Sequence, residues 1–206
     1  MSKKPVIVFE GIEGSGKSYH ISNVIRYFKK KKIDYIKIRE PGGSRNAEKI
    51  RKLILDKKSN FNKNTDLLLY LAARSENLNQ LNSNFGKKII LIDRFVDSTI
   101  AYQHYGFGVN LNLINIINKY LLNKFKVDFT FLNTVDKKNM IQRLKSRKSL
   151  NRYDKFNFNF YQKVQKGFLM LAKNNKKRYQ LIDSNLDKNR NKFLILEKIK
   201  KLIWMI

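Results

Sequence analysis

The chain has 206 residues and is 42% apolar, so it can bury a sizeable core and is not a disordered chain. It has no cysteine, which excludes disulfides, thiolate metal sites and a cysteine nucleophile, and its two histidines leave little material for a zinc site or a Ser-His-Asp triad. The apolar runs at 6–9 and 202–206 are too short for a signal peptide or a membrane span of about 20 residues. We therefore expect a cytoplasmic protein.

The charge is strongly unbalanced, with 44 Lys and Arg against 16 Asp and Glu and a net charge of +28. Such a charge attracts polyanions, and both nucleic acid and phosphate-bearing small molecules are candidate partners. The sequence is also crowded with Lys, Asn, Ile and Phe, the residues of A+T-rich codons. We favour this compositional origin, in which the lysines form a solvated surface, and expect no specific nucleic-acid partner and no membrane partner.

Short apolar runs alternate with helical patterns along the chain. The pattern predicts strands at 6–10, 35–39, 88–93, 129–132 and 179–182. It predicts helices at 21–28, 47–55, 66–79, 97–102, 111–122, 136–148, 156–173 and 195–202. Strands that are apolar almost throughout are typical of a parallel sheet covered on both faces. We therefore predict one α/β domain over residues 1–206, with three α/β/α layers around a five-stranded parallel sheet.

A glycine-rich segment follows the first predicted strand and fits the pattern G-x-x-x-x-G-K-[ST] at every specified position. It consists of Gly11, Ile12, Glu13, Gly14, Ser15, Gly16, Lys17 and Ser18. Its backbone N–H groups can form an anion nest at the positive end of the next helix. Lys17 can reach the β- and γ-phosphates, and the Ser18 hydroxyl can ligate Mg²⁺. The segment therefore predicts a nucleoside triphosphate site.

The identity of the phosphate acceptor is a separate question. The chain lacks the Asn-Lys-x-Asp and Asp-x-x-Gly motifs of a regulatory GTPase. A motor or transporter ATPase is normally longer. We therefore expect transfer of the phosphoryl group to a small acceptor.

Four further segments, together with this loop, resemble bacterial thymidylate kinases. They are Arg-Glu-Pro-Gly-Gly at 39–43, Tyr-Leu-Ala-Ala-Arg at 70–74, Asp-Arg-Phe-Val-Asp-Ser-Thr-Ile-Ala-Tyr-Gln at 93–103, and the arginine-containing stretch at 143–154. The match runs in order from about residue 6 to residue 183. The resemblance implies a P-loop nucleoside monophosphate kinase fold, phosphorylation of dTMP to dTDP by ATP with Mg²⁺ in dTTP biosynthesis, and a homodimer formed through helices.

The resemblance also implies the groups that act in phosphoryl transfer. Asp93 and Ser18 would hold Mg²⁺, and Arg94 would contact the acceptor phosphate; an ion pair between Asp93 and Arg94 is the structural alternative. A lid at about 143–154 would bring cations to the transferring group. An exposed basic helix is the alternative for this lid. The catalytic set is therefore Lys17, Asp93, Arg94, Arg143, Arg147 and Arg152.

The acceptor site implied by the family is lined by Glu13, Arg39, Glu40, Pro41, Arg51, Tyr70, Arg74, Arg94, Thr99, Tyr102 and Gln103. In this resemblance, arginines bind the 5′-phosphate, Tyr70 stacks on the pyrimidine and Arg74 donates to its O4. Tyr102 crowds the 2′ position of the sugar, and Glu13 reaches toward the 3′-hydroxyl. For single residues, a surface arginine or a core aromatic side chain is the alternative.

Two other functions stay open at this point. One is a kinase for a different nucleoside or monophosphate on the same scaffold. The other is a nucleic-acid-binding P-loop protein, which the charge favours, although the chain lacks an RRM-type aromatic signature.

Overall fold

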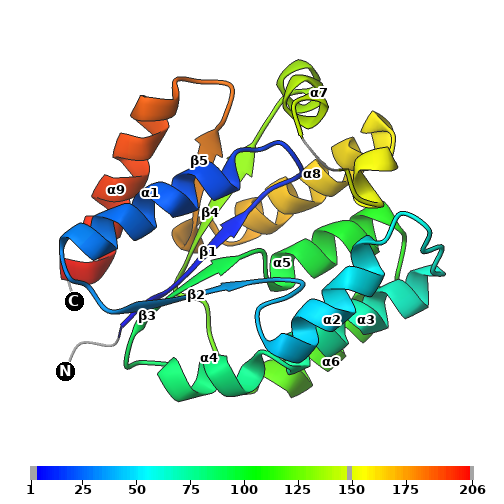
Figure 1. Cartoon of the computed structure of the whole chain (residues 1–206), viewed down its shortest axis with the longest axis horizontal. Helices are drawn as coiled ribbons and strands as arrows, with labels where there is room; N and C mark the ends of the chain where they lie inside the picture. The colour runs from blue at the N-terminus through cyan, green and yellow to red at the C-terminus, as the bar shows by residue number, and fades with distance from the viewer. Residues whose placement is uncertain (1–3, 148–149, 205–206) are drawn as a thin grey trace.

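The computed structural model describes residues 4–147 and 150–204 (Figure 1). Five strands form one sheet: β1 (Val6–Glu10), β2 (Tyr35–Arg39), β3 (Ile89–Asp93), β4 (Phe129–Thr134) and β5 (Tyr179–Asp183). All are parallel, in the order β2-β3-β1-β4-β5, which confirms the predicted sheet. The chain moves from central β1 first to one side of the sheet and later to the other. Such a switch point creates a crevice at the carboxyl ends of the strands.

Helices cover both faces of this sheet (Figure 1). On one face, α1 (Lys17–Lys30) and α9 (Lys188–Trp204) pack against Ile7 and Phe9 of β1. Val6 and Val8 point to the other face, toward α4 (Leu78–Asn84) and α5 (Val96–Thr99). Because successive strand residues alternate between faces, one buried strand supports both layers. The predicted three-layer fold is thus confirmed.

The remaining helices lie on the α4 side of the sheet or at its carboxyl end (Figure 1). They are α2 (Arg45–Leu55), α3 (Lys63–Ser75), α6 (Leu111–Leu122), α7 (Lys137–Lys145) and α8 (Phe158–Asn174). Within the described ranges, no helix is both long and apolar enough to cross a membrane.

The helix predicted at 66–79 is two helices. The first, α3, begins earlier because the Asn62 side chain accepts hydrogen bonds from the backbone N–H groups of Asn64 (3.0 Å) and Thr65 (2.9 Å). It ends at Ser75, before Asn77, whose side chain instead bonds the loop after β2, accepting from Ser44 N (2.9 Å) and donating to Gly42 O (2.7 Å). These tertiary contacts separate α3 from α4.

Two other predicted helices also differ from the structure. The segment at 97–102 begins as α5 and continues as a π-helix, η1 (Ile100–Gly106), a rare form that often occurs at functional sites. The helix predicted at 136–148 stops at Lys145, and the Ser146 hydroxyl donates to the carbonyl of Arg143 (2.9 Å) in the last turn. Residue 148, the predicted end of this helix, residue 149 of the predicted lid and residues 205–206 of the last apolar run lie outside the described residues.

Candidate functional site

The glycine-rich loop connects β1 to α1 at the carboxyl edge of the sheet. Gly11 has φ +137°, and a Cβ there would lie 2.2 Å from the carbonyl oxygen of Asn133, so no other residue fits. Gly16 is the N-cap of α1 in the left-handed conformation, with φ 83°. The loop therefore has the backbone geometry that its sequence predicts, with the start of α1 turned toward a ligand site.

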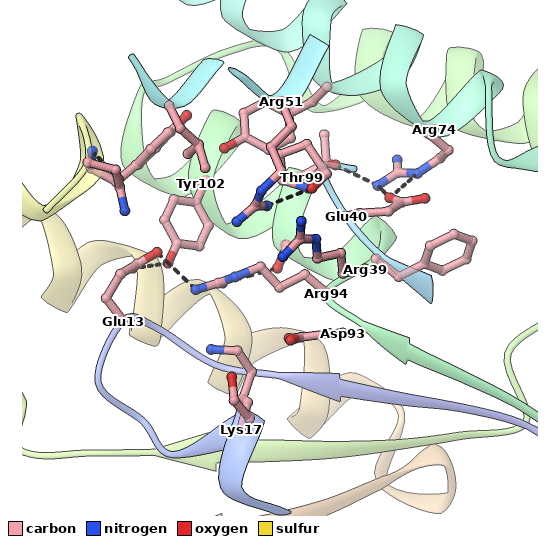
Figure 2. Close-up of a pocket in the computed structure, with 18 of the residues that line it drawn as sticks. Glu13, Lys17, Arg39, Glu40, Arg51, Arg74, Asp93, Arg94, Thr99 and Tyr102 are labelled. Carbon is pink, nitrogen blue, oxygen red and sulfur yellow. Dashed lines mark hydrogen bonds and ion pairs between the residues drawn. The ribbon is translucent and has the colours of Figure 1, made fainter. Parts of the chain in front are cut away.

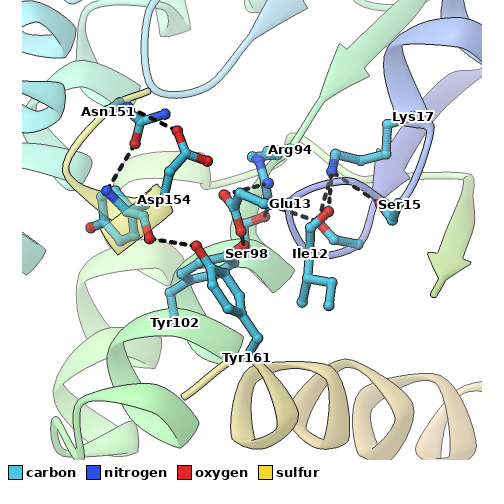
Figure 3. A network of polar contacts seen from close by, with 12 residues as sticks. Ile12, Glu13, Ser15, Lys17, Arg94, Ser98, Tyr102, Asn151, Asp154 and Tyr161 are labelled. Carbon is cyan, nitrogen blue, oxygen red and sulfur yellow. Dashed lines mark hydrogen bonds and ion pairs between the residues drawn. The ribbon is translucent and has the colours of Figure 1, made fainter. Parts of the chain in front are cut away.

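Lys17 is nearly buried in this loop. Its Nζ donates to the carbonyl oxygens of Gly11 (2.8 Å) and Ile12 (3.0 Å), and lies 3.3 Å from Ser15 Oγ (Figure 3). Burial lowers the pKa of Lys17 to about 7, and the charge of Arg94 acts in the same direction. A phosphate group beside Nζ would favour its charged form.

A cavity of about 230 Å³ opens beside the loop, at the carboxyl ends of β1 and β3 (Figure 2). Most of the predicted site residues line it. They are Glu13, Lys17, Ser18, Arg39, Glu40, Pro41, Arg51, Tyr70, Arg74, Asp93, Arg94, Thr99, Tyr102, Gln103 and Arg147. The structure therefore brings the predicted donor and acceptor residues to one pocket, which we call the central pocket.

Arg94 follows β3 directly and has φ +65°, an unusual backbone for a residue with a side chain. Its Nη1 donates to Gly11 O (2.8 Å) and its Nη2 to Glu13 Oε1 (2.9 Å). The ion-pair partner of Arg94 is thus Glu13 and not the adjacent Asp93, which lines the central pocket. Backbone strain of this kind is kept where the surrounding structure fixes a functional group.

Glu13 and Tyr102 form a buried pair next to Arg94 (Figure 3). The Tyr102 hydroxyl donates to Glu13 Oε2, and the Arg94 guanidinium lies over the Tyr102 ring, 5.2 Å from its centroid. Burial alone would raise the pKa of Glu13, but the charges of Arg94 and Lys17 hold it below its usual value. The carboxylate is therefore an anion that accepts hydrogen bonds at the edge of the pocket.

The opposite end of the pocket holds a buried ion pair between Glu40 and Arg74 (Figure 2). Arg74 donates to Glu40 Oε2 from Nε (2.9 Å) and Nη2 (2.7 Å), to Asn118 Oδ1 (2.6 Å) and to Thr99 Oγ1 (3.0 Å). Burial raises the pKa of Glu40, although the charge of Arg74 opposes this. Arg74 of α3 is therefore held rigidly, with α5, α6 and the loop after β2 each contributing a partner.

Arg39, the last residue of β2, and Arg51, on α2, also line the central pocket. Arg39 pairs with Glu48, 3.0 Å from Nε to Oε1 and 2.8 Å from Nη2 to Oε2, and its side chain is 49% exposed. Arg51 is less exposed, and its Nη1 donates to Pro41 O (2.6 Å). Arg39 therefore belongs both to a surface ion pair and to the pocket wall.

The three lid arginines go to three different places. Arg143 donates to Gly14 O (2.9 Å) and Ser184 O (2.6 Å), beside the phosphate-binding loop. Arg147 lines the central pocket and pairs with Asp154 (2.6 Å). The helix predicted at 136–148 would have held both Arg143 and Arg147, but this is wrong because α7 ends at Lys145. Arg152 does not line this pocket and pairs instead with Asp66 on α3.

Sequence reasoning missed a buried carboxylate at the end of β1. Glu10 accepts hydrogen bonds from Phe95 N (2.8 Å), Ser98 N (3.2 Å) and Ser98 Oγ (2.6 Å), and so fixes the segment after Arg94. Burial, with the charge of Asp97, raises its pKa to about 7. The available signal was a charged residue at the end of an otherwise apolar strand.

Other pocket residues were also missed, although all of them except Leu55 lie within the segments at 93–103 and 143–154 that carry the resemblance. They are Leu55, Phe95, Ser98, Asn151 and Tyr153.

The side chains present are compatible with Mg²⁺. Ser18 and Asp93 supply a hydroxyl and a carboxylate to the same pocket. The described residues contain no group of three or more His, Cys, Asp or Glu that could form a complete protein cage for a metal. Mg²⁺ commonly takes one or two protein oxygens together with water and substrate phosphates, so this small donor set fits it.

Comparisons with known proteins agree with this geometry. The family model for thymidylate kinase matches residues 9–195. A thymidylate kinase of Acholeplasma laidlawii is 36% identical over 95% of this chain and 98% of its own length, and one of Ligilactobacillus salivarius is 38% identical over 88% and 91%. The crystal structure of thymidylate kinase from Ehrlichia chaffeensis superimposes with a TM-score of 0.78 at 29% identity, covering 97% of this chain and 99% of that one.

Proposed function

The chain belongs to the thymidylate kinase family, and we propose that its phosphate-binding loop and central pocket hold the two nucleotides of that family's reaction. The enzyme transfers a phosphoryl group from ATP to dTMP and forms dTDP. The observation that carries the placement is the convergence of Lys17, Asp93 and Arg94 on one cavity at the carboxyl ends of β1 and β3. An anion nest and the guanidinium that contacts it through Gly11 and Glu13 then border the space where a phosphoryl group would move.

We place the phosphates of ATP on residues 11–18. The Lys17 ammonium leaves the carbonyls of Gly11 and Ile12 and turns to the β- and γ-phosphates. A second cavity, which includes Gly16, His20, Arg143 and Leu186 in its lining, opens on the other side of the loop. Its combination of apolar side chains and a guanidinium plane suits a nucleobase, so we assign the adenine to it.

Ser18 and Asp93 would hold Mg²⁺, directly or through water. When bound, this ion neutralises charge on the donor phosphates and orients them for transfer. Each residue already faces the pocket that receives the phosphates.

The acceptor occupies the central pocket, with its phosphate toward Arg94. Arg39 and Arg51 border the same end and add positive charge. The base lies toward Arg74 and Tyr70, where the guanidinium can donate to the pyrimidine O4 and the ring can stack. Glu13, Tyr102 and the loop residues Glu40 and Pro41 border the sugar and the base, and Thr99 and Gln103 approach the ring edge.

Transfer requires little covalent chemistry from the protein. The acceptor phosphate is already anionic, so a strong general base is not needed. Arg94 and Arg147 face the region where charge spreads over the equatorial oxygens, and alignment with water excluded supplies most of the acceleration. We keep residues 143–154 as the lid. Arg143 supports the loop through the carbonyl of Gly14, and Arg152 pairs with Asp66 outside the central pocket.

We also propose that the enzyme is a homodimer and acts in the cytoplasm, where ATP and dTMP are available. The dimer proposal is supported by exposed apolar side chains on two contacting helices, Leu68 on α3 and Leu113, Ile116 and Tyr120 on α6. Ile116→Glu should halve the mass measured by light scattering after gel filtration. A monomeric unaltered protein would contradict the dimer.

The experiment that tests the acceptor is a panel of dTMP, dUMP, CMP and thymidine, each with ATP and Mg²⁺, in a coupled ADP-release assay. We expect dTMP to give the highest kcat/KM. Preference for CMP or thymidine would reassign the pocket to a different acceptor, and no turnover with any of them would count against the placement as a whole.

A further inference from the structure

We propose that Asp66 is a positioning residue that sets which end of the Gln103 side-chain amide faces the pyrimidine, and thereby the preference for thymine over cytosine. The inference rests on the placement of the base proposed above. Asp66 lies on α3, one helical turn before Tyr70, and is 2% exposed. It does not line the central pocket itself, so its effect must pass through its neighbours.

Asp66 receives hydrogen bonds from three residues in two parts of the chain. Its Oδ1 accepts from Nη2 of Arg152, in the lid. Its Oδ2 accepts from the hydroxyl of Tyr153 (2.8 Å) and from Nε2 of Gln103 (3.1 Å), which is on η1. Paired with the Arg152 guanidinium, Asp66 is an ionised carboxylate, and an ionised carboxylate can only accept hydrogen bonds.

This restriction orients the amide. Gln103 can bond Asp66 only through its Nε2, because Oε1 in that place would set two acceptors against each other. Its Oε1 is therefore turned away from Asp66. Gln103 is fully buried and lines the central pocket, and its Oε1 has no hydrogen-bond partner among the residues that the structure describes. A buried acceptor without a partner is costly, so a ligand that donates a hydrogen bond there gains affinity.

Thymine and cytosine differ at the position that would meet this acceptor. Thymine carries an N3–H donor between two carbonyl oxygens, whereas N3 of cytosine is an acceptor. Arg74 supplies donors and suits O4, and Gln103 Oε1 supplies an acceptor and suits N3–H. Asp66 thus makes the pair Arg74 and Gln103 complementary to thymine and mismatched to cytosine.

Asp66→Asn should reverse the Gln103 amide. Arg152 still requires an oxygen, whereas the Tyr153 hydroxyl can rotate and accept, so the Asn amide nitrogen takes the place of Oδ2 and donates toward Gln103. Gln103 then turns Oε1 toward this nitrogen and Nε2 toward the base. The ratio of kcat/KM for dTMP to that for dCMP should fall by about tenfold or more, the effect of one mismatched buried hydrogen bond. A loss of folded protein alone lowers both values equally and leaves the ratio unchanged.

Two further variants locate the effect. Asp34→Asn makes the same chemical change at an exposed residue and should leave the ratio unchanged. Gln103→Met removes the amide, and after this change Asp66→Asn should have no additional effect on the ratio. Independent, additive effects of the two substitutions would overturn the proposal.

The result also separates this inference from the base placement on which it rests. If the unaltered enzyme prefers dTMP and Asp66→Asn keeps that preference within threefold, the inference fails and the placement stands. If the unaltered enzyme does not distinguish dTMP from dCMP, the placement itself fails. Should Asp66→Asn not fold, a neutron structure of the unaltered enzyme with dTMP gives the answer, since it must show the Gln103 amide deuterons facing Asp66 and not N3.

Discussion

Replacing Arg74 with glutamine should destabilise the enzyme strongly. The side chains of Arg74 and Glu40 are 1% and 4% exposed, and the guanidinium contacts Glu40, Asn118 and Thr99. Removing one partner of a buried, hydrogen-bonded ion pair leaves an uncompensated charge and typically costs about 3–5 kcal/mol. We expect Arg74→Gln to lower the free energy of unfolding by an amount in this range at pH 8.

The loss should depend on pH, with a sign that follows from Glu40. Burial already raises the pKa of Glu40, and the charge of Arg74 opposes that rise. In Arg74→Gln the folded-state pKa rises further above the unfolded value. Stability is then lost as pH increases from the unfolded pKa upward, with a slope of at most about 1.4 kcal/mol per pH unit. The variant should therefore be less destabilised at pH 5.5 than at pH 8.

Urea unfolding followed by circular dichroism at both pH values measures this effect. Arg39→Gln is the matched control, because its pair with Glu48 is largely exposed and should contribute less than about 1 kcal/mol. Adding Glu40→Gln to Arg74→Gln should recover much of the loss, since it removes the uncompensated charge. An equal loss at both pH values, or a loss no larger than that of Arg39→Gln, would refute the reasoning.

Three further predictions concern the reaction. Lys17→Ala and Arg94→Ala should each lower kcat/KM at least about a hundredfold, and unchanged ADP release by either folded variant would count against the site. The pKa of Lys17 is about 7 without nucleotide, so binding of a non-hydrolysable ATP analogue at pH 8 should take up a proton from the buffer. The binding heat measured by calorimetry should therefore differ between phosphate and Tris buffers, and equal heats would contradict this. Arg147→Ala should lower kcat by a larger factor than it raises KM for dTMP, whereas Arg190→Ala, at an exposed residue, should change neither. A rise in KM with kcat unchanged in Arg147→Ala would exclude Arg147 from transfer.

The strands and their parallel arrangement could be predicted from the sequence because β1 and β3 are almost unbroken apolar runs and helical patterns separate the strands, whereas the strand order was not predicted. The helix boundaries were harder, since distant side chains decide them. Asn77 separates α3 from α4 through bonds to the loop that follows β2, and no local pattern reveals such contacts. The π-helix η1 could not be predicted from the sequence either, because its residues fit an ordinary helical pattern equally well.

The site was predictable where a motif carries its own geometry, as the loop ending in Lys17 and Ser18 does. It was less predictable where a side chain has a choice of partners. Arg152 is equally consistent with a phosphate contact and with an ion pair, and only the packing of the lid against α3 brings it to Asp66. The role of Glu10 in fixing the segment after Arg94 was not predicted for a similar reason, since its partners lie more than 80 residues away in the sequence.

A crystal structure with dTMP, a non-hydrolysable ATP analogue and Mg²⁺ tests the central claim most directly. We predict that the triphosphate lies on residues 11–18 and that the dTMP phosphate lies within hydrogen-bonding distance of Arg94, in line with the γ-phosphate. A dTMP molecule bound away from the end of β3, or a triphosphate bound away from the loop, would contradict the account.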